Sequence, residues 1–164
     1  MSSNRSRIVA VGIATALAGA AAVPALTTGQ SPAARTITVQ EANVHVAMDD
    51  VAPKSRGNRV SLGDRLTTRQ SLFNATKARV GTLYTDCTSV GPTAPIFNGA
   101  LLLCTLSYRF ADGQISASGL LSLTKPIPVP ITGGTGAYAG AEGTIGPAKP
   151  LKGYDSADLI TITG

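Results

Sequence analysis

The sequence predicts an all-β domain that closes into an antiparallel barrel of eight strands. Short runs of alternating apolar and polar residues recur along the chain between Gly- and Pro-rich turns, which is typical of a barrel or a sandwich. After residue 34 no window has convincing helical periodicity, with one turn of helix at residues 71–78 as the exception. The runs 100–110 and 115–123 each have one nearly continuous apolar face and one polar face, which favours a barrel with an interior.

Residues 1–34 are expected to be a secretory signal peptide and a short linker. Arg5 and Arg7 precede an apolar run over residues 8–23, and small residues suited to signal cleavage follow. A retained membrane anchor normally needs about 20 apolar residues, and this run is shorter, so we favour cleavage. No other segment is apolar enough to be a membrane-spanning helix. We therefore expect a secreted, extracellular domain over residues 35–164, with no membrane contact after cleavage.

The strands of this domain are expected at residues 35–48, 66–73, 80–90, 99–110, 114–123, 129–132, 142–145 and 156–163. The first is β-branched and alternating, and its phase changes near Ala42 and Asn43. Residues 49–63 hold charges, glycines and a proline, and predict a long loop. Asp112-Gly113 is a hairpin signal between the fourth and fifth strands.

The connections of the second half are rich in proline and glycine. Alternate prolines restrict residues 125–130 to an edge or an extended connection. Residues 133–143 contain five glycines and resemble a phosphate-binding loop, but residues 144–147 (Thr-Ile-Gly-Pro) cannot start the helix that such a loop needs. We interpret this run as a tight β-connection with several residues at positive φ.

Two cysteines in an exported chain favour a disulfide. Cys87 and Cys104 lie symmetrically about the turn at residues 91–95 and would face each other in a hairpin centred near Pro95. Two buried thiols, or a pocket thiol with a chemical role, remain the alternatives. The two cysteines and the single His45 do not supply a metal site of usual spacing, so we expect no metal.

The charge pattern argues against a nucleic-acid partner. The formal net charge of +5 falls to +3 once Arg5 and Arg7 are removed, and the remaining cations are scattered. Nucleic-acid binding usually needs a basic stripe with stacking aromatic residues. Only 4% of residues are aromatic and none is Trp, so a mildly basic solvated surface is the better explanation.

Several short motifs occur in an order that is similar to one known family. They are Val39-Gln40-Glu41, Leu62-Gly63-Asp64, Leu72-Phe73, Asp112-Gly113-Gln114-Ile115, Ile131-Thr132-Gly133-Gly134-Thr135-Gly136 and Ala139-Gly140 with Gly143. Together they resemble the allene oxide cyclase barrel family and its dirigent relatives. The resemblance implies an eight-stranded antiparallel barrel whose lumen holds a small hydrophobic molecule. Such proteins are often trimeric, which leaves a homo-trimer open, and their isomerase or cyclase chemistry needs no cofactor.

The catalytic residues of the cyclases are not retained here. Their Glu and Asn late in the first strand fall on Val46 and Met48, which can neither polarise a substrate nor bind an epoxide oxygen. A further pocket Asn falls on Gln70, whose amide still donates and accepts, and a pocket Cys falls on Cys87. We therefore do not expect allene oxide cyclase activity itself.

Two functions stay open: a cofactor-independent isomerase or cyclase, and a non-catalytic, lipocalin-like carrier. The candidate catalytic residues are Gln70 as hydrogen-bond partner, Tyr108 as donor, and Glu41 or Asp86 as acid or base. Each also has a structural explanation, since strand carboxylates are commonly solvated and Tyr108 could simply pack. The pocket is expected to be lined by Gln70, Leu72, Cys87, Leu102, Leu106, Tyr108 and Ala117. Leu101 and Leu103 interrupt an otherwise polar face and are candidates for a subunit contact.

Overall fold

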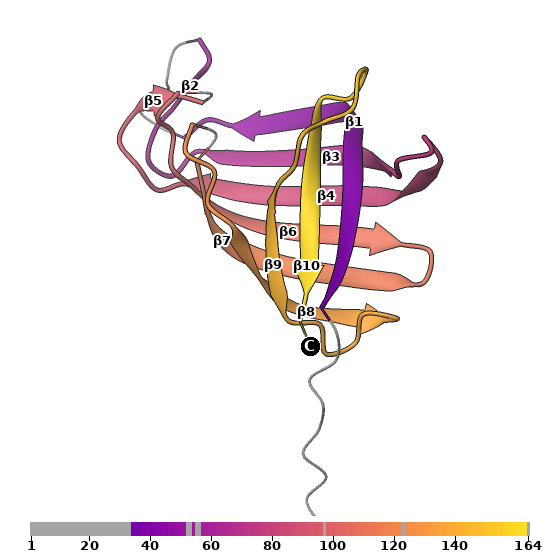
Figure 1. Cartoon of the computed structure of the whole chain (residues 1–164). Coiled ribbons are helices and arrows are strands. Elements are labelled where there is room, and N and C mark those ends of the chain that lie inside the picture. The colour runs from indigo at the N-terminus through magenta and orange to yellow at the C-terminus, as the bar shows by residue number, and fades with distance from the viewer. Residues whose placement is uncertain (1–33, 52–53, 55–56, 97, 123, 164) are drawn as a thin grey trace, which may run out of the picture. The chain divides into compact units, whose positions relative to one another are not determined.

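A closed antiparallel barrel forms the described part of the chain (Figure 1). The computed structural model describes residues 34–51, 54, 57–96, 98–122 and 124–163. Nearly all of the expected signal peptide lies outside these residues. Within them, no helix is long and apolar enough to cross a membrane.

Eight strands make the barrel, as predicted. In the order in which they pair, they are β1 (Arg35–Asp49), β10 (Ser156–Ile162), β9 (Gly143–Pro147), β8 (Val129–Gly136), β7 (Gly113–Leu121), β6 (Leu102–Phe110), β4 (Arg79–Ser89) and β3 (Arg65–Phe73). The ring closes where β3 pairs with β1. A small separate sheet joins β2 (Arg59–Val60) to β5 (Ala94–Pro95), within segments expected to be a loop and a turn.

A bulge divides β1 and produces the phase change that the sequence predicts. The register of β1 with β3 shifts between Ala42 and His45, and Asn43 has a φ of 57°. An extra residue in one strand of an antiparallel pair moves the following side chains to the other face. Glu41 before the bulge and Val44 and Val46 after it therefore all face the barrel interior.

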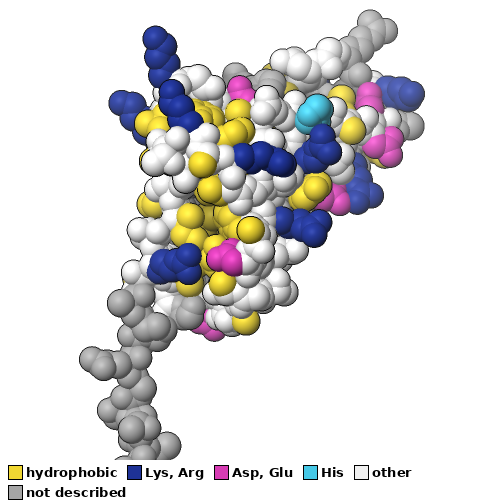
Figure 2. Space-filling view, turned by 90° about the vertical axis from the view of Figure 1, so that its right-hand side faces the viewer, with side chains coloured by type: hydrophobic (Ala, Val, Ile, Leu, Met, Phe, Trp, Pro, Cys, Tyr) yellow, Lys and Arg dark blue, Asp and Glu magenta, His cyan; other side chains and the backbone are white. Residues whose placement is uncertain are grey.

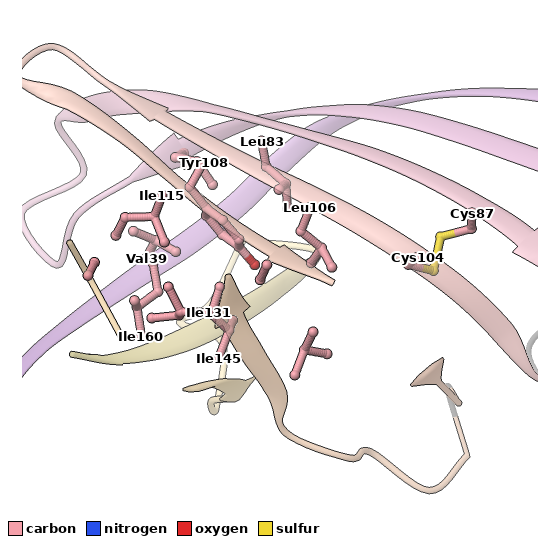
Figure 3. Packing of buried hydrophobic residues seen from close by; sticks show 14 of the residues in the cluster. Val39, Leu83, Cys87, Cys104, Leu106, Tyr108, Ile115, Ile131, Ile145 and Ile160 are labelled. Carbon is pink, nitrogen blue, oxygen red and sulfur yellow. A yellow bond between two sulfur atoms is a disulfide. The ribbon is translucent and has the colours of Figure 1, made fainter. Parts of the chain in front are cut away.

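The end of the barrel where β6, β8 and β10 terminate is filled with side chains. Aliphatic residues from several strands, including Val39, Ile115 and Ile160, are almost completely buried there (Figure 3). The rings of Phe110 and Tyr138 pack together, with their centroids 5.3 Å apart. The Arg35 guanidinium lies 5.4 Å from the centre of the Tyr138 ring. These contacts close one end, so any guest must occupy the other part of the lumen.

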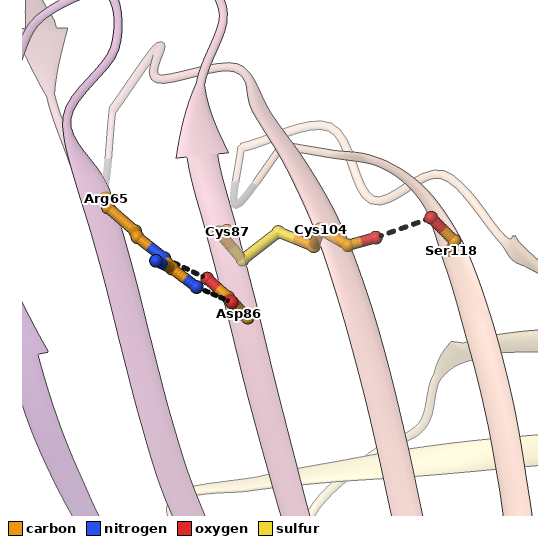
Figure 4. The surroundings of a disulfide bond; sticks show 5 residues. All are labelled: Arg65, Asp86, Cys87, Cys104 and Ser118. Carbon is orange, nitrogen blue, oxygen red and sulfur yellow. Dashed lines mark hydrogen bonds and ion pairs between the residues drawn. A yellow bond between two sulfur atoms is a disulfide. The ribbon is translucent and has the colours of Figure 1, made fainter.

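A disulfide joins Cys87 of β4 to Cys104 of β6, which confirms the favoured pairing (Figure 4). The two residues are direct partners in the register of these strands, with Cα atoms 4.0 Å apart. The thiol alternatives are therefore wrong. The Cys104 carbonyl also accepts a hydrogen bond of 3.1 Å from the Ser118 hydroxyl of β7.

The prediction for residues 133–143 is confirmed in part, because Gly133, Gly136, Gly140 and Gly143 have positive φ and a turn lies at residues 137–140. The glycines at 133–136, however, belong to strand β8. Gly134 is needed for close approach, because a Cβ there would lie 2.2 Å from the Tyr138 carbonyl oxygen. The expected helical turn at residues 71–78 is absent from the described chain, because β3 continues to Phe73 and a turn follows. The Asn74 side chain supports that turn by accepting from the amides of Thr76 and Ala78.

Removing the disulfide is expected to destabilise the barrel without changing its topology. The Cys87→Ala/Cys104→Ala double variant should lose about 2–4 kcal/mol of unfolding free energy, because a short closed loop is released in the unfolded chain. Urea unfolding measures the difference. A reductant should lower the midpoint of the wild type and leave that of the double variant unchanged; an unaffected wild type would contradict the expectation.

Candidate functional site

A cavity of about 630 Å³ occupies the unfilled part of the lumen. Its wall is mainly apolar and is built from residues of all eight barrel strands, and the β5–β6, β7–β8 and β9–β10 connections also contribute to it. Representative apolar lining residues are Leu66, Leu83, Leu102, Leu106, Val129 and Ile145. This volume lies in the range of roughly 300–1,000 Å³ that small-molecule pockets occupy.

A small polar cluster interrupts this apolar wall. Glu41 comes from β1, Tyr108 from β6, and Ser156 and Asp158 from β10. Glu41 and Ser156 are register partners across β1 and β10, and the Ser156 hydroxyl donates a 2.6 Å hydrogen bond to Glu41 Oε2. From another wall of the barrel the Tyr108 hydroxyl donates to Asp158 Oδ2. The cluster therefore combines two carboxyl groups with two hydroxyl donors.

Glu41 is the most perturbed acid of the site. Only 4% of its surface is exposed, and its Oε1 atom has no hydrogen-bond donor among the described residues. Burial, followed by the hydrogen-bonded and charged Asp158 carboxyl beside it, raises the pKa of Glu41 to about 9. At neutral pH Glu41 therefore holds a proton, which it can share with Asp158.

Tyr108 stays a neutral donor for the same physical reasons. Its side chain is fully buried, and burial together with the negative charge of Asp158 raises its pKa well above the ordinary value. Its hydroxyl keeps its proton and holds the Asp158 carboxylate in place.

The connection between β9 and β10 is fastened to β1 next to Glu41. The Asp155 amide donates to the Glu41 carbonyl over 2.8 Å, and the Leu151 amide donates to Gln40 Oε1 over 2.8 Å. Gln40 is itself buried. These two bonds hold the connection against the strand that carries the acid, and the connection lines the cavity through Ala148, Pro150 and Asp155.

Most of the predicted site residues line the cavity. They are Glu41, Gln70, Cys87, Leu102, Leu106 and Tyr108. Leu72 and Ala117 instead lie fully buried outside the lining, because the lumen is filled at their level. The prediction that they belong to the pocket is corrected accordingly.

Asp86 lies on the outer face, so its prediction as an acid or base of the pocket is wrong. Residues alternate along β4, and Cys87 next to it points into the cavity. The Asp86 carboxylate accepts from Arg65 Nε over 2.8 Å and forms an ion pair with the same guanidinium (Figure 4). This pairing lowers the pKa of Asp86.

Sequence reasoning missed Ser156 and Asp158. A signal existed, because both have the same parity in the last strand as the buried Ile160 and Ile162. An acid on the inward face of a strand is unusual unless it has a partner. The partner, Tyr108, lies 50 residues away along the chain.

A family model, the allene oxide cyclase barrel like domain, matches residues 40–156. Solved structures with similar folds include a pyocyanin demethylase, 24% identical with a TM-score of 0.60, covering 79% of this chain and 99% of that one. An exo-specific intermolecular Diels-Alderase is 13% identical, with a TM-score of 0.59 and coverage of 80% and 98%. A pterocarpan synthase dirigent protein is 15% identical, with a TM-score of 0.60 and coverage of 81% and 95%. No curated protein matches the sequence.

The raised pKa of Glu41 predicts that stability falls as pH rises. Between the ordinary value of 4.5 and about 9, the folded chain binds a proton at Glu41 that the unfolded chain has lost. The unfolding free energy should therefore fall with pH across this window, by at most about 1.4 kcal/mol per pH unit, and level off above it.

Urea unfolding of the wild type and of Glu41→Gln over this pH window tests the expectation. The variant should lose this part of the slope, because Gln does not titrate. Glu142→Gln, which changes an exposed glutamate, is the control and should behave as the wild type. Equal slopes for wild type and Glu41→Gln would show that Glu41 does not carry the effect.

Proposed function

This chain belongs to the allene oxide cyclase barrel-like family, and from that premise we propose that its lumen binds a hydrophobic small molecule and isomerises or cyclises it. The observation that carries the proposal is the pairing of a protonated Glu41 with Asp158 at one place in an otherwise apolar cavity. Apolar walls supply binding energy by burying the ligand, and the polar cluster fixes its orientation.

The acid pair can act as proton donor and proton acceptor in one step. Glu41 gives its proton to an oxygen or nitrogen of the bound molecule as negative charge develops there. The Asp158 carboxylate takes a proton from another position, so the molecule is rearranged with no change in composition. A positioned acid or base of this kind typically contributes a rate factor of about 10²–10⁴. Because the chain supplies both groups, this chemistry calls for no cofactor.

The barrel also contributes by holding the ligand in a reactive geometry. A cyclisation needs two ends of one molecule to meet, and a shaped apolar cavity limits the conformations available to it. Gln70 lines the same cavity on β3 and offers an amide that can both donate and accept. It is the candidate for orienting a second polar group.

A non-catalytic carrier is the alternative, and one observation favours it. Val46, which occupies a position where the cyclases carry a catalytic residue, lines the cavity as an apolar side chain. A carrier needs only the cavity, and in a carrier the Glu41–Asp158 pair would serve only to orient the ligand.

We propose an extracellular location. The Cys87–Cys104 disulfide supports it, because such bonds persist in oxidising compartments. We also propose Leu103 as a subunit contact. It is 49% exposed and lies directly opposite the exposed Leu120 on the neighbouring strand.

Filling the cavity with a charge should abolish ligand uptake. Leu106→Arg places a guanidinium in the lumen, whereas Thr105→Arg changes an exposed residue on the same strand. With the neutral dye N-phenylnaphthylamine, we expect fluorescence enhancement by wild type and Thr105→Arg, and about a tenfold or greater loss of affinity for Leu106→Arg. Circular dichroism checks that both variants fold. Undiminished dye uptake by a folded Leu106→Arg would contradict the lumen as binding site.

Catalysis and carriage are separated by Glu41→Gln. Native mass spectrometry of the protein from its culture medium identifies a co-purifying molecule, which is then incubated with wild type and variant. An enzyme should lose about a hundredfold or more in turnover, with affinity changed by only a few-fold, because a neutral amide replaces a neutral acid of the same shape. Binding without conversion by the wild type would establish the carrier.

A further inference from the structure

The carboxyl groups of the cavity wall have no positively charged counterpart there. Glu41, Asp155 and Asp158 all line the cavity, while none of the lining residues that the structure describes is Lys, Arg or His. Lys and Arg side chains instead spread over the outer surface (Figure 2). Because Glu41 is protonated and Asp155 is exposed, the wall carries the negative charge of Asp158 with no cation beside it, in low-dielectric surroundings where charges interact more strongly than in water.

The acid pair marks where a positive group would be received. Glu41 Oε1 is buried and accepts from no N–H or O–H donor of the described chain, and the hydrogen bond between the Glu41 and Asp158 carboxyl groups needs a proton between two acceptors. Asp158 Oδ2 is also engaged by Tyr108. A ligand that brings a positively charged donor to this place can replace that proton and satisfy both carboxyl groups.

We propose that the lumen selects hydrophobic molecules that carry a basic or cationic nitrogen and discriminates against hydrophobic carboxylates. The inference rests on the proposed function, since it specifies the ligand class of the same cavity. The nitrogen lies against the carboxyl groups of Glu41 and Asp158 and replaces their shared proton. The apolar body of the ligand lies along Leu83, Leu106, Val129 and Ile145.

An organic cation fits these acids better than a metal ion does. The described residues contain no group of three or more His, Cys, Asp or Glu side chains placed to hold a metal. The adjoining wall is apolar, which suits a hydrocarbon or aromatic body attached to the positive group.

Because Glu41 holds a proton, the site can bind either a neutral amine or a molecule that is already cationic. A neutral amine accepts this proton and becomes an ammonium paired with the Glu41 and Asp158 carboxylates. A molecule that is already cationic displaces the proton, which leaves to solvent while Glu41 becomes its counterion. In each case the positive charge of the ligand replaces the neutralisation that the proton provided.

The charged and titratable groups around this position are few. β1 contributes Glu41, β6 contributes Tyr108, β10 contributes Asp158, and the β9–β10 connection contributes Asp155. Lys149 and Lys152 of that connection and Lys125 before β8 are exposed. Their ammonium groups interact through solvent and are screened by salt, so they affect the mouth of the cavity more than its wall.

A matched series of decyl compounds tests the proposal on the unmodified protein. Decylamine, which is protonated at neutral pH, decanol and decanoate share one chain and differ in head group. The measurement is the concentration at which each compound displaces N-phenylnaphthylamine from the wild type. We expect decylamine to act at a concentration at least about tenfold lower than decanol, equivalent to roughly 1.4 kcal/mol, and decanoate to be the weakest.

Two variants assign the preference to the site. In Glu41→Gln/Asp158→Asn the preference for decylamine over decanol should fall to within about twofold. Asp86→Asn removes a carboxylate from the outer face and should keep the preference. Calorimetry of wild type in two buffers of different ionisation enthalpy should show release of up to one proton with decylamine and none with decanol.

The outcomes separate the two proposals. If the dye does not bind the wild type, the proposed function fails. If the dye binds but decanoate competes as well as decylamine, only the charge selection is overturned. A preference that survives in the folded double variant, or decylamine binding without proton release, also overturns it.

Discussion

The barrel depends on the bulge in β1, because the bulge lies where this strand passes from its pairing with β10 to its pairing with β3. Its first half pairs with β10 and its second half with β3, and the register shifts between Ala42 and His45. Without the extra residue, the side chains after Asn43 would exchange faces, and Val44 and Val46 would leave the lumen. The bulge thus places Glu41 and the apolar wall beyond it on the same surface.

The acid pair that follows from this closure is costly for a core. Two carboxyl groups taken from water repel each other unless a proton or a cation neutralises them, and apolar side chains of similar volume would often be more stable. Here a shared proton, the Ser156 hydroxyl and the Tyr108 hydroxyl satisfy most of the polar atoms. A group kept at such cost beside a cavity is typical of a functional site.

Prediction from sequence worked where side-chain alternation alone decides the outcome. The apolar face of residues 102–110 is buried as expected, and the pairing of Cys87 with Cys104 follows from the symmetry of their hairpin. Prediction failed where the position of a residue depends on its contacts with a neighbouring strand. Asp86 pairs with Arg65 of β3 on the outside, and Gly134 is a strand residue because β8 pairs there with Ile115 of β7. Leu72 lies outside the cavity because side chains from other strands fill the lumen at its level. The local sequence pattern does not indicate this.

The sequence by itself determined the barrel strands, the phase change at Ala42–Asn43 and the inward placement of Tyr108, because these follow from a period of two residues and from local backbone preferences. It left Glu41 open between the lumen and a solvated strand face. Only the tertiary structure decided that Asp158 meets both Glu41 and Tyr108, since the three residues come from separate strands that become neighbours when the barrel closes. The tertiary structure also decided the protonation of Glu41. It arises from burial and from a second carboxyl group, and both exist only in the folded chain.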